Sequence, residues 1–200
     1  MKELKTDIAI IGAGVGGVAA ALGALRSGRS VVMTEPCDWI GGQLTSQAVP
    51  SDEHSWIEQF GGSRTYRELR TAIRQFYRDH YPLTEGARAW GDLNPGAGWV
   101  SRMCVEPRVP VAVMEAWLMP YIGSGRLTLL KPYQPVAAEM DGDRVRAVTV
   151  QHVNSGAQVQ IEAAYVIDAT ELGDLLPLTN TEYVTGCESQ ADTGEPSAPA

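Results

Sequence analysis

The sequence is poor in the residues that build disulfide frameworks and metal sites. It contains only three cysteines and three histidines in 200 residues. Cys37, Cys104 and Cys187 are far apart, odd in number and without a CxxC pair, which fits neither a disulfide framework nor a zinc site. We therefore expect no bound metal, and a reducing, cytoplasmic compartment.

Basic charge is scarce as well. Lysine and arginine number 16 against 24 aspartates and glutamates, and the net charge is −8. No basic run is longer than two residues. We therefore expect neither nucleic acid nor an anionic membrane surface among the partners. The composition leaves the oligomeric state open.

No long apolar run is free of glycine. Lys2 and Lys5 precede an apolar stretch over residues 8–25, an arrangement that resembles a signal peptide. Five glycines interrupt that stretch, namely Gly12, Gly14, Gly16, Gly17 and Gly23. It is too rich in glycine for a membrane helix, so we interpret it as part of the fold.

This first stretch predicts a βαβ unit. Residues 8–11 form a short apolar run, as expected of a strand that is buried on both faces. Residues 15–26 are rich in alanine and leucine and favour a helix, which Gly28 ends. Residues 30–34 predict a second buried strand, parallel to the first and joined to it by a right-handed crossover.

The turn between the first strand and the helix matches GxGxxG at Gly12, Gly14 and Gly17. The first glycine makes the tight turn, the second lets backbone approach a diphosphate, and the third lets the helix pack close to the strand. Glu35 follows about 20 residues later, where a carboxylate accepts hydrogen bonds from ribose hydroxyls and disfavours a 2′-phosphate. In this context the motif predicts a bound dinucleotide, FAD or NAD, rather than a glycine-rich helix start without a ligand.

The middle of the chain predicts an insertion. Residues 44–106 mix aromatic, polar, glycine and proline residues, and we expect a lid or part of a substrate region there. Thr65 and Glu68 predict a capping box that opens a basic helix ending near Tyr81. Five arginines recur along this helix, namely Arg64, Arg67, Arg70, Arg74 and Arg78. We expect them to form a solvated basic face; Arg64 or Arg102 is the candidate to bind an anionic substrate.

The second half predicts one helix and several strands. The helix covers residues 109–122, and a strand follows over 126–130. A meander of three antiparallel strands is predicted over 135–140, 144–153 and 157–162, and a last buried strand over 164–169.

The predicted fold class is therefore α/β. We expect a Rossmann-like, FAD-binding parallel sheet with a three-stranded antiparallel β-meander and a helical or loop insertion. Residues 1–43 and 107–185 would form the FAD-binding domain, and residues 44–106 the insertion. Residues 186–200 form a polar tail, which we expect to be disordered or truncated.

With this combination of elements, the chain resembles the glutathione-reductase-like FAD superfamily. More narrowly, it resembles FAD-dependent oxidoreductases that include proteins labelled xanthan-lyase-like. The stretches that carry the narrower resemblance are Trp39–Gln47, Pro50–His54, Gly61–Arg64 and Val166–Asp174. In many relatives the last stretch reads Ala-Thr-Gly, whereas Glu171 stands in place of the glycine here. Proteins of this family continue well beyond this length, so the resemblance implies an N-terminal fragment.

The resemblance also implies noncovalent FAD and hydride transfer between the flavin and an unidentified small-molecule substrate. The residues implied for the diphosphate and the adenosine ribose are Gly12, Gly14, Gly17 and Glu35. Those implied along the diphosphate and ribityl chain and toward the flavin ring are Gly41, Gly42, Gln43 and Thr45. Val136 would offer its backbone to the adenine, and Ala169 and Thr170 would pass close to the cofactor.

The sequence does not identify the catalytic residues. His54, beside two acidic residues, is the one candidate for a general acid or base. Trp56, Trp90 and Trp99 either line a substrate pocket or pack in a core.

Two other functions stay open. One is an NAD-binding dehydrogenase domain, which the meander and the pair Gly41-Gly42 disfavour. The other is a non-catalytic dinucleotide-binding module, in which the glycine motif would also be present.

Overall fold

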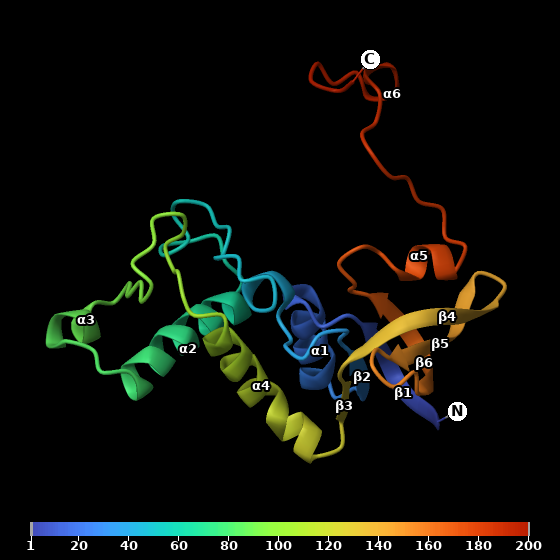
Figure 1. The fold of residues 1–200 in the computed structure, drawn as a ribbon, viewed down its shortest axis with the longest axis horizontal. Coiled ribbons are helices and arrows are strands. Elements are labelled where there is room, and N and C mark those ends of the chain that lie inside the picture. Colours follow the sequence, from blue (N-terminus) through green and yellow to red (C-terminus); the bar gives the residue numbers. More distant parts are fainter. Residues whose placement is uncertain (1, 200) are drawn as a thin grey trace.

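The computed structural model describes residues 2–199, which contain one six-stranded sheet (Figure 1). The strands are β1 Lys2–Ile11, β2 Val31–Thr34, β3 Leu127–Leu130, β4 Tyr133–Asp141, β5 Arg144–His152 and β6 Gln158–Asp168. Their order across the sheet is β3-β2-β1-β6-β5-β4. Strands β3, β2, β1 and β6 are parallel, whereas β5 and β4 pair antiparallel with their neighbours. The predicted α/β class, with its parallel sheet and antiparallel meander, is confirmed.

The βαβ unit forms as predicted, although its first strand is longer than expected. Strand β1 begins at Lys2 because its first half pairs with β6, and Lys5 forms an ion pair with Glu162 at 3.0 Å. Only the last three residues of β1, 9–11, are fully buried. The apolar run in the sequence, residues 8–11, therefore predicted only the buried end of this strand. Gly28, with φ +83°, follows the helix end.

One expectation about the meander is wrong. The strands predicted over 157–162 and 164–169 are a single strand, β6. Its first part pairs antiparallel with β5, and nearly its whole length pairs parallel with β1. The same strand therefore ends the meander and continues the parallel sheet. The first half of β6 alternates between buried and more exposed residues, whereas its second half has no buried residue, so the burial pattern changes within one strand.

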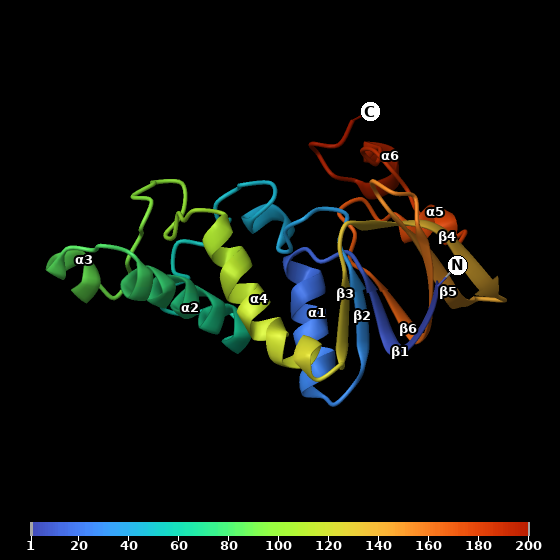
Figure 2. The ribbon, with the colours of Figure 1, turned by 60° about the horizontal axis from the view of Figure 1, so that its bottom comes forward.

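The helices of the described chain are α1 Val15–Arg26, η1 Gly42–Leu44, α2 Arg64–His80, α3 Glu85–Ala89, α4 Arg108–Gly123, α5 Leu175–Leu178 and α6 Gln190–Thr193. Helices α1, α2 and α4 lie on one side of the sheet, whereas α5 packs on the opposite face (Figure 2). Helix α4 lies between α1 and α2 and packs against both. Leu22, Ile73 and Leu118 from these three helices share one buried cluster with Met33 of β2. This cluster attaches the inserted segment to the sheet.

Helix α2 begins two residues earlier than the predicted capping box requires. Its N-cap is Ser63, whose Oγ accepts a hydrogen bond from the backbone N–H of Tyr66 at 3.2 Å. Thr65 lies within the helix and accepts a hydrogen bond from Arg26 instead. The expectation of a Thr65–Glu68 capping box is wrong, because Ser63, two residues before Thr65, already caps the helix. The predicted end near Tyr81 is confirmed.

The solvated basic face predicted for α2 is wrong at two positions. Arg70 and Arg74 are buried, with 3% and 6% of their surface exposed. The loop before α2 folds back over the helix, so that Arg70 pairs with Glu53 and Glu58, and Arg74 pairs with Glu58 at 2.5 Å. The helical spacing of the arginines carries no information about that loop.

The C-terminal residues run away from the sheet (Figure 1). Helix α5 packs near β4, and the short helix α6 lies in an exposed segment. None of the helices described over residues 2–199 combines the length and apolar character needed to cross a membrane.

Candidate dinucleotide-binding site

Three strands end at the same edge of the sheet. Ile11 of β1 is the register partner of Thr34 in β2 and of Asp168 in β6. In open α/β sheets, ligands bind outside the carboxyl ends of parallel strands. The glycine loop after β1, Glu35 after β2 and Ala169-Thr170 after β6 therefore meet at one place.

Packing requires the glycines at this edge. Gly12 has φ +102°, and a Cβ there would overlap the carbonyl oxygen of Ala169. A Cβ at Gly17 would overlap the carbonyl oxygen of Gly12. The first and third glycines of the motif thus hold the strand, the helix and the β6 loop together. The N-terminus of α1 is left facing the cavity, where its free N–H groups suit a diphosphate.

Glu35 lies buried beside the glycine loop. Its Oε2 accepts a hydrogen bond from the backbone N–H of Ala13 at 3.1 Å, and its Oε1 from that of Cys37 at 3.0 Å. Burial raises the pKa of Glu35 above its ordinary value, although these two hydrogen bonds oppose the rise. A carboxylate has about four acceptor positions, so capacity remains for ribose hydroxyls.

A cavity of about 380 Å³ lies at this edge. Of the residues implied for FAD, those that line it are Gly12, Gly14, Glu35, Gly42, Ala169 and Thr170. It is also lined by residues that were not predicted as cofactor contacts, namely Ala13, Thr34, Pro36, Cys37, Ser46, Gln47, Gln134, Pro135, Glu171, Leu172 and Asp174. Most of these residues are immediate neighbours of the motif residues in the sequence. That adjacency was the only signal that could have predicted them as part of the cavity wall. Gln134 and Pro135 come from β4 and directly precede Val136, the residue implied for the adenine.

The other implied residues lie outside this lining. Gly17 packs under Gly12, and Gly41 packs against Thr45 and Met114. The buried Oγ1 of Thr45 donates to the Ile40 carbonyl at 2.6 Å, which ties down the turn after β2. Gln43 belongs to η1 and is likewise absent from the cavity wall.

Val136 stands beside the cavity at an irregular point of β4. Its neighbour Pro135 pairs with Val150 and Ala137 pairs with Thr149, so a bulge falls at Val136. The extra residue of a bulge is left unpaired in the ladder. That geometry suits the backbone contact with adenine that is expected of Val136.

Asp168 organises the loop after β6. Its Oδ1 accepts hydrogen bonds from the backbone N–H of Thr170 at 3.0 Å and from the Thr170 hydroxyl at 2.7 Å. Its Oδ2 accepts one from the backbone N–H of Leu175 at 3.0 Å. The Asp-Ala-Thr run, an Asx turn, was the signal that could have identified this role.

Glu171 reaches across the glycine loops. Its Oε1 lies 3.2 Å from the position of a Cβ on Gly14 and 2.5 Å from that of a Cβ on Gly42. The carboxylate therefore lies where backbone from both loops would approach a diphosphate. Because the Glu171 side chain is exposed, it is free to turn outward, and the glycine loops and Glu35 then fit FAD.

The candidate general acid or base, His54, lies outside this cavity. Its Nδ1 accepts a hydrogen bond from the backbone N–H of Trp56 at 3.2 Å, and its ring stacks near Phe60. These contacts hold the loop before α2. A catalytic role for His54 stays a prediction.

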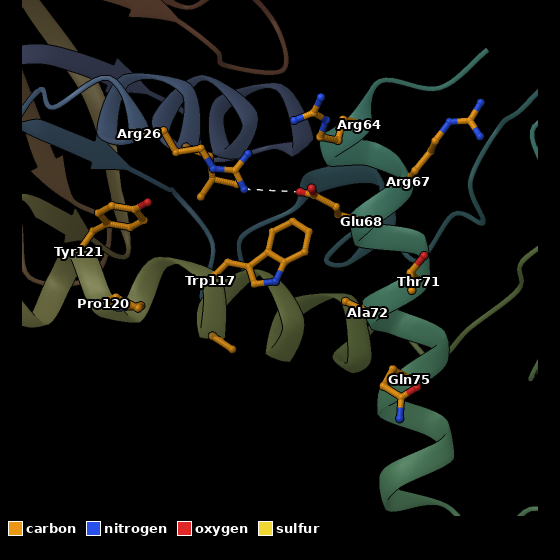
Figure 3. A pocket seen from close by; sticks show the side chains of 12 residues that line it. Arg26, Arg64, Arg67, Glu68, Thr71, Ala72, Gln75, Trp117, Pro120 and Tyr121 are labelled. Atoms are coloured by element: carbon orange, nitrogen blue, oxygen red, sulfur yellow. Dashed lines mark ion pairs between the residues drawn. The ribbon is translucent and has the colours of Figure 1, made fainter. Parts of the chain in front are cut away.

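Another hollow, of about 1000 Å³, lies elsewhere, between α1, α2 and α4. Figure 3 shows Arg26 of α1 and Trp117 of α4 lying between these helices, with Arg26 paired to Glu68 of α2 at 3.6 Å. Both charged side chains are about half exposed, so the pair adds little stability. We assign the cofactor to the smaller cavity, because the strand ends and the glycine motif converge there.

The fold and this edge of the sheet define a dinucleotide-binding α/β protein. The sequence matches the family described as FAD dependent oxidoreductase over residues 7–200. The chain therefore belongs to the FAD-dependent oxidoreductases, and FAD is the cofactor of its family. No curated protein sequence matches it.

Solved flavoprotein structures share the fold. The apo Sdh1 complex of Mycobacterium smegmatis has a TM-score of 0.51 and 14% identity, with 85% of this chain and 35% of that chain covered. The glycerol-3-phosphate dehydrogenase of Bacillus halodurans complexed with FAD has a TM-score of 0.51 and 14% identity, with 88% and 36% covered. The chain thus spans about a third of the length of these proteins.

Proposed function

We propose that this chain forms the dinucleotide-binding part of an enzyme that transfers hydride between a small-molecule substrate and noncovalent FAD. The observation that carries the proposal is the meeting of the glycine loop, Glu35 and Ala169-Thr170 at the carboxyl ends of three parallel strands. The isoalloxazine ring, when bound, supplies the redox chemistry.

The residues of this chain bind and orient the cofactor. Backbone N–H groups at the start of α1 face the diphosphate, where the helix dipole favours negative charge. Glu35 accepts hydrogen bonds from the ribose hydroxyls, and the bulge at Val136 offers backbone to the adenine. Asp168 fixes the loop that carries Ala169 and Thr170 against the glycine turn.

The state of Cys37 supports a noncovalent cofactor. Loss of hydration raises the pKa of its thiol, and the nearby charge of Glu35 raises it further. The thiol therefore stays protonated near neutral pH and is a poor nucleophile. Cys37 lines the cavity as a neutral group.

We propose the same division of the chain that the sequence predicted. Residues 1–43 and 107–185 contribute the sheet, and residues 44–106 form an insertion on the helical side. We also propose a cytoplasmic location, from the three widely spaced cysteines.

Titration of the purified chain with FAD and with NAD, followed by calorimetry and flavin fluorescence, tests the proposal. We expect saturable FAD binding that Gly12→Ala abolishes, and much weaker NAD binding. Preferential NAD binding would establish the dehydrogenase alternative. For a chain that holds FAD, the absence of flavin reduction in the full-length protein by any organic hydride-donor substrate would support a non-catalytic module.

A further inference from the structure

We propose that a separate cavity, formed by the loops on either side of α2 and α3, binds a neutral polyhydroxylated ligand of the oligosaccharide class. The cavity has a volume of about 640 Å³ and is lined from residues 53–59 and 90–102. These two loops lie side by side in both ribbon views (Figures 1 and 2). The cavity shares no lining residue with the dinucleotide cavity, so this inference stands whether or not FAD binds.

Three exposed tryptophans surround the cavity. Trp56 is 58% exposed, Trp90 53% and Trp99 93%. Single exposed apolar side chains are ordinary on a protein surface, but large aromatic groups gathered around one hollow mark a binding site. An indole face is negative, and the C–H groups on the face of a pyranose ring are weakly positive, so the two surfaces stack.

Glu53 lines this cavity, and one oxygen of its carboxylate is an unsatisfied acceptor. Its side chain is only 3% exposed. Its Oε1 accepts hydrogen bonds from the Tyr66 hydroxyl and from Arg70. Its Oε2 is buried without a hydrogen-bond partner in the described part of the chain. A buried acceptor without a donor costs stability, and a ligand hydroxyl would supply the missing donor.

The backbone of the cavity wall is held in place. The Asn94 side chain donates to the Gly98 carbonyl at 2.8 Å and accepts from the backbone N–H of Cys104 at 2.7 Å. Arg78 donates to the Trp90 carbonyl at 3.0 Å. These contacts fix the loop that carries Trp90 and Trp99, which reduces the entropy lost when a ligand binds.

The charges of the wall favour a neutral ligand. Its two glutamates are each paired with a buried arginine of α2. The remaining charged residues of the lining are one acid, Asp92, and one base, Arg102, whose formal charges cancel. A quaternary ammonium ligand would need surplus negative charge around the tryptophans, and a uronate would need surplus positive charge. A sugar instead uses donors, acceptors and aromatic faces together.

Titration of the ¹⁵N-labelled chain tests the inference, because the five tryptophans give five indole N–H signals. The probes are cellotetraose, maltotetraose, xylotetraose and mannotetraose, with tetramethylammonium and trigalacturonate as charged comparisons. We expect at least one neutral probe to shift the signals of Trp56, Trp90 and Trp99 saturably, while Trp39 and Trp117 stay unchanged. The inference is overturned if no neutral probe shifts the three signals, if all five shift alike, or if a charged probe binds more tightly.

Variants then assign the contacts. Trp99→Ala should weaken binding of the best neutral probe about tenfold, whereas Trp39→Ala should leave it unchanged. Glu53→Gln should weaken it about tenfold as well, because the acceptor charge is lost. Trp99 is exposed and can be replaced without disturbing the core. Its variant therefore tests the proposed binding even if Glu53→Gln unfolds. Unchanged affinity in Trp99→Ala would refute the proposed contact.

Discussion

Replacing Glu171 by glutamine should tighten FAD binding by the chain. The Glu171 carboxylate lies between Gly14 and Gly42, where the diphosphate is expected. Two unit charges about 4 Å apart repel by about 1 kcal/mol at the dielectric constant of water and by about 4 kcal/mol at an effective value of 20. The side chain is exposed, so the smaller value applies, which corresponds to about a fivefold gain in affinity.

The assay is calorimetry with FAD for the native chain, Glu171→Gln and Glu171→Gly. The glycine variant removes volume as well as charge and should bind at least as tightly as the glutamine variant. Glu3→Gln is the matched control, because it removes the same charge from the opposite end of β1. The gain should shrink in about 1 M salt, where the Debye length is about 3 Å. Equal or weaker binding by Glu171→Gln would refute the repulsion that we infer.

Three further changes test the site and the fold. Gly12→Ala should abolish FAD binding and destabilise the chain by about 2 kcal/mol or more, since a Cβ there overlaps Ala169 at positive φ; FAD titration and urea unfolding measure both. Arg70→Met should cost about 3–5 kcal/mol in urea unfolding, because Glu53 and Glu58 lose a partner. Burial alone would raise the pKa of Glu58, but its paired arginines outweigh burial and lower it. The stability from Glu58 is therefore present above the ordinary glutamate pKa and should be lost as pH falls through the lowered value, as urea unfolding across acidic pH will show.

Each of these expectations has a contradicting result. If the Gly12→Ala variant still bound FAD, the inference that the glycine turn forms part of the FAD site would be wrong. For Arg70→Met, Arg64→Met is the control, since Arg64 is exposed, and equal stability of the two variants would contradict the buried cluster. An acid unfolding profile unchanged by Glu58→Gln would contradict the pairing of that carboxylate.

The sequence alone predicted the βαβ unit and a dinucleotide ligand, while the family match identified that ligand as FAD. A buried strand, a glycine turn, an alanine-rich helix and Glu35 follow one another within 35 residues, and each signal depends only on near neighbours. Conformational requirements such as the positive φ of Gly12 are local, and the choice of glycine at that position indicates them directly. The meander was also predicted, because its turns carry Asp-Gly and Ser-Gly signals.

Contacts between distant segments were decided only by the tertiary structure. The arginine spacing of α2 did not show that Glu53 and Glu58 fold over Arg70 and Arg74, since a solvated and a buried helix face have the same periodicity here. The Glu171 carboxylate reached the glycine loops only because β6 pairs with β1. The periodicity of the sequence determines on which face of its own helix or strand a side chain lies. The packing of other elements determines which residues that side chain contacts.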